Sequence, residues 1–177
     1  GVLKGDLDDE IKKKGSQIKH IGSQFDLGPL KYIKEFKRIC KELGTPDIVH
    51  IHMNAKSGVI AFAAKKARIN QLIIHSHADL KFRGSFFSRL ISNLELVIQK
   101  QLMAISANHF WGCSQEANES LFYKRLLTSK NSAIIKNAVD VTSYQNVSIA
   151  RVKELRESYG VKEGTIVFGN VGRVVRH

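Results

Sequence analysis

The feature that most constrains the fold is an alternation of short, β-rich apolar runs with helical segments along the chain. The runs predicted as strands are Gln17–Ile21, Asp47–Met53, Gln71–Ser76, His109–Ser114, Ser132–Lys136 and Thr165–Val171. The predicted helices extend from about Gly28 to Gly44 and over Ser57–Arg68, Ser85–Ala107, Gln115–Leu127 and Ile149–Tyr159. Because apolar strands separated by helices are typical of a parallel sheet with both faces covered, we predict a doubly wound α/β fold.

Length and charge narrow the choice of partners. The chain has 177 residues, which suits one domain with a full core but is short for two full-sized ones. A formal net charge of +12 favours polyanions: nucleic acid, acidic membrane or phosphorylated small molecules. A basic surface that is merely solvated is the alternative. The two cysteines, Cys40 and Cys113, form no CxxC motif, and we expect buried thiols in a reducing cytosol.

Four of the seven histidines form two pairs, His50 with His52 and His75 with His77, at the ends of successive predicted strands. The i, i+2 spacing places both members of a pair on one face. Ligands of doubly wound sheets bind at the carboxyl ends of the strands, so these histidines and Asp79 in the following loop are expected to line a cleft. Imidazole suits both proton sharing near neutral pH and metal ligation, whereas a lone strand histidine is more often a hydrogen-bonded core residue.

A metal site is one interpretation of the second pair. The segment His75–Asp79 has the HxHxD pattern of some metallohydrolases, but Leu80 stands where the HxHxDH type has a further histidine. Such sites need three or four ligands. A metal-dependent hydrolase that uses His50, His52, His75, His77 and Asp79 therefore remains an alternative, whereas the main interpretation expects no metal and no bound cofactor.

Two turn motifs follow further along the chain. Asn137-Ala138-Val139-Asp140 lies after a predicted strand and before a helix, where a chain passes from one domain to the next, although a simple turn would have the same composition. Gly169-Asn170-Val171-Gly172-Arg173 ends the last predicted strand. Glycine lets backbone N–H groups approach a phosphate and Arg can bind it with paired hydrogen bonds, although Arg173 could equally be a solvated charge.

In this order the segments resemble family 4 of the retaining glycosyltransferases, which have the GT-B architecture, and within it the capsular and exopolysaccharide biosynthesis type. The segments that carry the resemblance are Pro46–His52, Ala55–Gly58, Ile73–Ala78, Gly112–Phe122, Ile134–Tyr144, the helix with Arg151 and Arg156, and Gly169–His177. The resemblance extends from about Asp6 to the end of the chain. The family's Gly-rich opening loop, its Glu-x7-Glu element and the Lys that follows its Gly-Arg have no counterpart here.

The resemblance implies an assignment of domains. Residues 1–138 would be most of a Rossmann-like acceptor-binding domain without its first strand, residues 139–163 the interdomain linker and helix, and residues 164–177 the first strand of a donor-binding domain. Sequence is therefore expected to be missing on both sides, and residues 1–177 alone are expected to be inactive.

The resemblance also implies a reaction. The full-length enzyme would transfer a sugar from a nucleotide sugar, most often UDP-linked, to a lipid-linked or saccharide acceptor with retention of configuration. His77 and Asp79 would be catalytic, Gly172 and Arg173 would bind the donor diphosphate, and His52, His75 and Asn137 would line the cleft. Family members hold the diphosphate with basic side chains and helix N-termini instead of a tightly bound metal.

The basic stretch around Lys81 and Arg89 opens an amphipathic segment that suits an anionic membrane surface, although the segment could equally pack onto the sheet. No apolar run reaches the ~20 residues of a spanning helix, and no signal peptide is visible. We therefore expect a cytoplasmic protein, peripheral to the inner face of the plasma membrane. A nucleic-acid-binding domain and a catalytically inactive acceptor-binding subunit remain alternatives, but no recognisable motif for specific nucleic-acid binding is present.

Overall fold

The computed structural model describes residues 4–82 and 84–169, and the chain divides into two compact units, Gly1–Lys136 and Asn137–His177. The first unit holds the strands β1 (Ile48–Ile51), β2 (Gln71–Ser76), β3 (His109–Gly112) and β4 (Ser132–Ile134). Its helices are α1 (Asp8–Lys13), α2 (Gln24–Glu42), α3 (Ser57–Lys66), α4 (Phe86–Ser106) and α5 (Gln115–Leu121), with the short 3-10 turns η1 (Asn54–Lys56) and η2 (Lys124–Leu126). The second unit contains α6 (Thr142–Gln145) and α7 (Ile149–Ser158).

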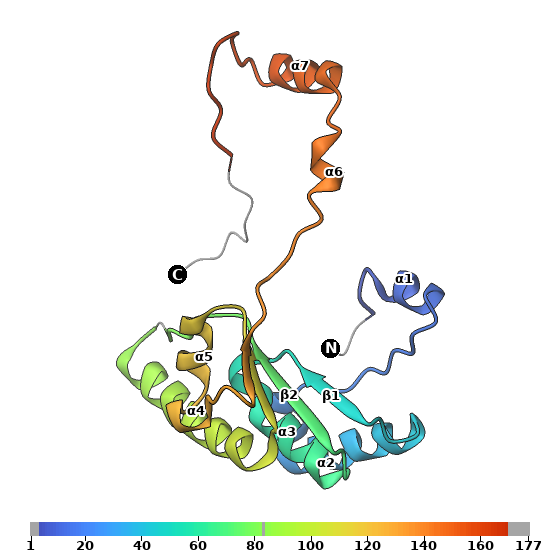
Figure 1. The fold of residues 1–177 in the computed structure, drawn as a ribbon, viewed down its shortest axis with the longest axis vertical. Coiled ribbons are helices and arrows are strands. Elements are labelled where there is room, and N and C mark those ends of the chain that lie inside the picture. Colours follow the sequence, from blue (N-terminus) through green and yellow to red (C-terminus); the bar gives the residue numbers. More distant parts are fainter. Residues whose placement is uncertain (1–3, 83, 170–177) are drawn as a thin grey trace. The chain divides into compact units, whose positions relative to one another are not determined.

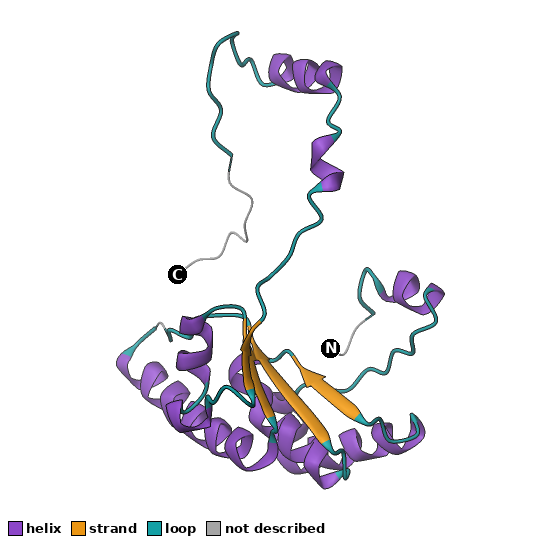
Figure 2. Cartoon of the chain, in the orientation of Figure 1, coloured by secondary structure: helices purple, strands orange, loops and turns teal. Residues whose placement is uncertain are grey.

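The four strands form one parallel sheet in the order β1-β2-β3-β4, with helices between successive strands (Figures 1 and 2). The predicted Rossmann-like α/β class is thus confirmed. The order of the described strands follows the sequence without reversal. Since parallel crossover connections are right-handed, such an order places the connecting helices on one face of the sheet. Figure 2 shows α2, α3 and α4 together on one side.

The core lies between this face and the helices. Ile51, Ile74 and Phe110, one from each of the first three strands, pack with Met103 of α4 and with α3. Side chains alternate along a strand, so His50, His75 and Trp111, which adjoin these core residues in sequence, point to the opposite face. The histidines that the sequence analysis singled out therefore lie on the sheet face away from α2, α3 and α4.

The contact between α3 and α4 depends on Gly58. A Cβ added to Gly58 would lie 2.3 Å from the backbone oxygen of Gln99. The side chain of Gln99 is buried, and its Oε1 accepts the backbone N–H of Val59 at 3.0 Å. Because residue 58 has no side chain, the two helices approach closely enough for Gln99 to accept the backbone N–H of Val59. This N–H lies near the start of α3 and would otherwise be unpaired.

Helix α2 begins earlier than the sequence predicts. Ser23 caps it by accepting the N–H of Asp26 at 3.1 Å. Gly28 then adopts a left-handed φ of 68°, so a first turn is set at an angle to the helix that Pro29 continues. The predicted start at about Gly28 thus corresponds to this kink.

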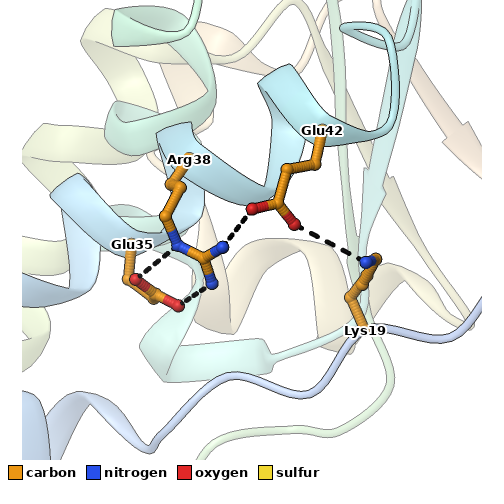
Figure 3. Close-up of polar contacts among 4 residues, drawn as sticks. All are labelled: Lys19, Glu35, Arg38 and Glu42. Carbon is orange, nitrogen blue, oxygen red and sulfur yellow. Dashed lines mark hydrogen bonds and ion pairs between the residues drawn. The ribbon is translucent and has the colours of Figure 1, made fainter.

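An ion-pair network lies on the surface of α2 (Figure 3). Arg38 contacts the carboxylates of Glu35 and Glu42, and Glu42 also lies 3.5 Å from the Nζ of Lys19 in the preceding irregular segment. The hydrogen bond from Arg38 lowers the pKa of Glu35, and the same pair raises the pKa of Arg38. Because all four side chains are substantially exposed, the network contributes little to the stability of the fold.

Two predicted elements differ from the structure. Gln17–Ile21 is irregular and not a strand, because the edge of β1 in the described sheet has no partner in this segment. The helix predicted over Gln115–Leu127 ends at Leu121, and η2 follows it. In the second unit, residues 165–169, the described part of the predicted strand Thr165–Val171, have no regular structure, and Phe168 is 93% exposed. The proposed donor-domain assignment of residues 164–177 stays a prediction.

We expect Gly58→Ala to destabilise the protein by about 1–3 kcal/mol through overpacking against Gln99. The sign is informative, because alanine in a helix interior is otherwise favoured over glycine by about 1 kcal/mol. Urea unfolding followed by circular dichroism measures the change. Gly169→Ala is the control, since its added Cβ meets no atom within 4 Å. A Gly58→Ala protein that is as stable as the wild type would contradict the close approach.

Candidate functional site

The four paired histidines meet at the carboxyl edge of the sheet. His50 lies in β1 and His52 just beyond it, whereas His75 lies in β2 and His77 directly after it. Strands β1 and β2 pair with Ile51 opposite Ile74, which brings the two pairs side by side. The ring centroids are 4.0 Å apart for His50 and His52, 4.3 Å for His75 and His77, and 5.2 Å for His52 and His75. We call these four residues the histidine cluster.

A direct contact joins the two strands within the histidine cluster. The Nδ1 of His52 lies 2.7 Å from the Nε2 of His77, a hydrogen-bond distance at which one ring donates and the other accepts. The backbone N–H of His77 donates to Oδ1 of Asn54 at 2.8 Å. The loop is held further by Ser120, whose hydroxyl donates to the carbonyl of Ala78 at 3.3 Å. His77 is therefore positioned through both its ring and its backbone.

His75 is the most enclosed member of the cluster. It is only 5% exposed, and neither ring nitrogen makes a hydrogen bond of good geometry, although the backbone of Ile135 lies close enough to favour the charged form weakly. Trp111 of β3 meets the edge of the cluster, with ring centroids 5.3 Å from His50 and 6.4 Å from His75. A buried imidazole with unsatisfied nitrogens is unusual and suggests a function beyond packing.

The electrostatics of the cluster favour uncharged rings. Burial lowers the pKa of His50, His52 and His75 below the ordinary value for histidine. Repulsion from the neighbouring imidazoles lowers each pKa further, with His77 acting on His52 and His75. At neutral pH these three rings are therefore neutral, and each keeps one nitrogen lone pair for a proton or a metal ion.

The predicted site residues are brought together only in part. His52, His75 and His77 lie in one cluster, and the carboxylate of Asp79 forms an ion pair with Lys81 at 2.7 Å. Asn137 is the first residue of the second unit. Gly172 and Arg173 lie outside the described residues, so their predicted contact with a diphosphate stays a prediction.

Three of the five residues in the alternative metal interpretation converge. One ring nitrogen from each of His50, His52 and His75 lies within 4.8 Å of the others, and within the described ranges this is the group of side chains that could hold a metal ion. Asp79 is not part of that group. The HxHxD pattern in β2 and the loop after it is therefore not one candidate ligand set; the candidate group combines His50 and His52, in and just after β1, with His75 of β2.

Sequence reasoning missed two residues of the site, Asn54 and Trp111. Asn54 has a positive φ of 46°, a conformation that asparagine tolerates better than most residues, and its place two residues after His52 was the available signal. Trp111 follows His109 at i, i+2 in a predicted strand, which places both on one face. The sequence predicts which side chains of a strand share a face, but it does not show which strands are neighbours in the sheet.

The chain matches no protein-family model and no solved structure. It is similar to a protein of Bacillus subtilis (strain 168) named "Putative glycosyltransferase EpsF", with 24% identity over 166 residues. These residues make up 94% of this chain but 42% of the relative, so the chain spans less than half the length of the curated protein it matches.

The lowered pKa values predict a dependence of stability on pH. A histidine whose pKa is lower in the folded than in the unfolded state contributes full stability above its unfolded pKa of about 6.5, and this contribution is lost as pH falls through the folded pKa. We expect the melting temperature to fall between pH 7.5 and pH 5.5, and the fall to be smaller in a His50→Gln, His52→Gln variant. Differential scanning calorimetry measures both, with His109→Gln as control. An equal fall in all three proteins would exclude the cluster as the cause.

Proposed function

We propose that the protein containing this chain is a retaining glycosyltransferase that moves a sugar from a nucleotide sugar to a lipid-linked or saccharide acceptor in cell-surface polysaccharide synthesis. The observation that carries the proposal is the similarity over 94% of the chain to a protein named as a glycosyltransferase. The position of the histidine cluster supports it, because ligands of Rossmann-like sheets bind at the carboxyl ends of the strands. Residues 1–138 would contribute the acceptor side of a GT-B enzyme.

In this proposal the bond between the anomeric carbon and the diphosphate oxygen breaks, a bond to an acceptor oxygen forms, and the proton of the acceptor hydroxyl passes to the departing diphosphate. His77 would contact the donor sugar and the acceptor, and its contact with His52 would hold the ring in place. Arg173, with the backbone of Gly172, would stabilise the charge that develops on the departing diphosphate. Asp79 would be the second catalytic residue, and His52, His75 and Asn137 would line the same cleft.

A groove lined by apolar side chains together with Asn93 and Arg89 supports a lipid-linked acceptor. It has a volume of about 350 Å³ and lies between the loop after β2 and helix α4. Its lining includes Leu80, Phe82, Phe86 and Leu90, with Arg89 as the charged group. Leu80 follows Asp79 directly, so the groove adjoins a predicted site residue. A lining that combines apolar side chains with an amide and a guanidinium fits a lipid tail next to a phosphate.

We expect the full-length protein to release nucleotide from one member of a nucleotide-sugar panel, and His77→Ala to reduce kcat by about 10²–10⁴-fold. Arg173→Ala should cost about 10²–10³-fold, as loss of a group that stabilises developing charge does. A coupled assay for released nucleotide, run with and without EDTA, measures this. His109→Ala, on the same sheet, is the control. Residues 1–177 alone should show no transfer.

The outcomes separate the alternatives. Sugar transfer by residues 1–177 alone would refute the domain assignment. No nucleotide release with any donor would argue against glycosyl transfer. Hydrolytic activity that EDTA abolishes and zinc restores would favour the metal-dependent hydrolase. An anomeric configuration that is inverted in the product would exclude the retaining mechanism while leaving the transferase.

We further propose that the protein contacts anionic membrane through α4. None of the helices in the described part of the chain combines the length and apolarity that crossing a bilayer requires. The buried side of α4 carries Gln99 and Ser106 beside Met103, whereas most of its exposed residues are apolar. The exposed apolar residues of α4 are Phe86, Phe87, Leu90, Ile91, Leu94, Val97, Ile98 and Ile105.

Charge favours lipid as the occupant of this surface. Glu95, the acidic residue of α4, forms an ion pair with Lys56, and Arg89 stands near the start of the helix. An apolar helix face in a chain of net charge +12 suits a bilayer interface that carries acidic headgroups. The groove next to Phe86 and Arg89 would then open toward the membrane that holds a lipid-linked acceptor.

We expect the protein to sediment with vesicles of phosphatidylglycerol and phosphatidylcholine, and an Ile91→Gln, Ile98→Gln variant to bind at least about tenfold more weakly, because two buried side chains are lost. Ile149→Gln, Ile166→Gln is the control, since it removes two exposed isoleucines of the second unit. Equal binding of both variants would contradict the proposal. Loss of self-association in ultracentrifugation, without any vesicle binding, would instead assign the α4 surface to a second copy of the chain.

A further inference from the structure

We propose that His50, His52 and His75 form a binding site for a divalent transition-metal ion of the zinc class, independently of the glycosyl transfer proposed above. Each histidine offers one ring nitrogen, and the three nitrogens lie within 4.8 Å of one another. His50 and His75 lie in adjacent parallel strands, whose backbone hydrogen bonds fix their spacing, and His52 follows the end of β1 directly. The site is therefore built by the most regular part of the fold.

The separation of the nitrogens suits one ion after small ring movements. Zinc binds imidazole nitrogen at about 2.0–2.1 Å in tetrahedral geometry, which places ligand nitrogens about 3.4 Å apart. His50 and His52 are exposed, so their rings can turn toward a common centre. His75 is held by its burial and by the rings around it. Two rings that can turn and one ring that is fixed are enough to bring the three nitrogens to the spacing that zinc requires.

The burial of His75 supports the metal site independently of the spacing of the nitrogens. Its side chain is 5% exposed, and both ring nitrogens are buried without a hydrogen bond of good geometry. A buried polar atom without a partner destabilises the folded chain relative to a paired one. A metal ion on one nitrogen would remove this destabilisation. Aromatic stacking with His50 at 5.4 Å accounts for the ring's position, whereas the backbone of Ile135 gives the ring only a weak polar contact.

The ligand set defines the class of ion. Three neutral imidazoles suit zinc, copper, nickel and cobalt, whereas magnesium and calcium require oxygen ligands. Three histidines leave a fourth tetrahedral position for water or an anion. His52 contacts His77 through Nδ1, so its Nε2 is the nitrogen that would face the ion. His77 would then be the outer partner that orients a ligand, as hydrogen-bonded groups around metal sites do.

The fluorescence of Trp111 would report whether a metal ion is bound at the three histidines. Trp111 is the one tryptophan of the chain, and its ring lies 5.3 Å from His50 and 6.4 Å from both His75 and His109. Copper or cobalt at the three-histidine site would quench its fluorescence. The same quenching would follow from an ion on His109, so variants of the two positions must be compared.

The test uses the full 177-residue chain without an affinity tag, at pH 7.5. Zinc binding is measured by calorimetry, Co²⁺ binding by its visible absorption, and Cu²⁺ binding by Trp111 fluorescence. We expect one ion per chain, an intense tetrahedral cobalt spectrum, and affinity at least about tenfold lower in His50→Gln and in His52→Gln. His109→Gln should bind as the wild type does. Far-UV circular dichroism checks that each variant is folded.

The opposite results would overturn the site. Binding that is unchanged in both His50→Gln and His52→Gln would place the ion elsewhere, and equal losses in His109→Gln would indicate non-specific surface binding. Absence of any one-to-one binding of zinc would overturn the metal site and leave the cluster with its ring packing and its role in the proposed glycosyl transfer. His75→Gln is a further arm: if it folds and binds zinc with wild-type affinity, the buried ring is not a ligand.

Discussion

The parallel pairing of β1 with β2 is the constraint on which the candidate site depends. Ile51 lies opposite Ile74, so residues an even number of positions from Ile51 in β1 or from Ile74 in β2 point to the same face of the sheet. The core residues therefore turn toward the helices, and the histidines turn together to the other side. A slip of one residue in either strand would bury imidazoles among the apolar residues of α3 and α4 and expose their neighbours. The burial of Ile51 and Ile74 thus secures the site as well as the core.

The helix face of the sheet explains why that register holds. Gly58 lets α3 lie against α4, and the buried amide of Gln99 fills the junction with a hydrogen bond to Val59. This packing seals one side of the sheet with small and aliphatic side chains. The other side keeps polar and aromatic groups at its carboxyl edge, where the backbone of the loop after β2 is fixed by Asn54 and Ser120. The closely packed helix face of the sheet thus supports the opposite face, which carries the histidines.

Sequence alone predicted much of this arrangement and missed the parts that depend on pairing between strands. Helices with clear caps or periodicity, such as α4 after Ser85, were predicted almost to the residue. Gln17–Ile21 was wrong, because a short apolar run becomes a strand only where a neighbour accepts its hydrogen bonds. The histidine pairs were readable from their spacing. The contact between His52 and His77, and the approach of Trp111, depend on which strands are neighbours, and local patterns do not encode that order.

The charge of the histidine cluster limits what it can do. In the described chain its ligand group consists of neutral imidazoles, and Asp79, the nearest carboxylate in sequence, is paired with Lys81. A bound dication would therefore carry its full charge within a chain of net charge +12. Such a centre attracts an anion to its open coordination position, and a diphosphate is an anion of that kind. Without a metal, the same edge of the sheet offers an imidazole at His77 that is held from two sides. An anionic ligand is therefore expected at the carboxyl ends of β1 and β2 if a metal ion is bound there.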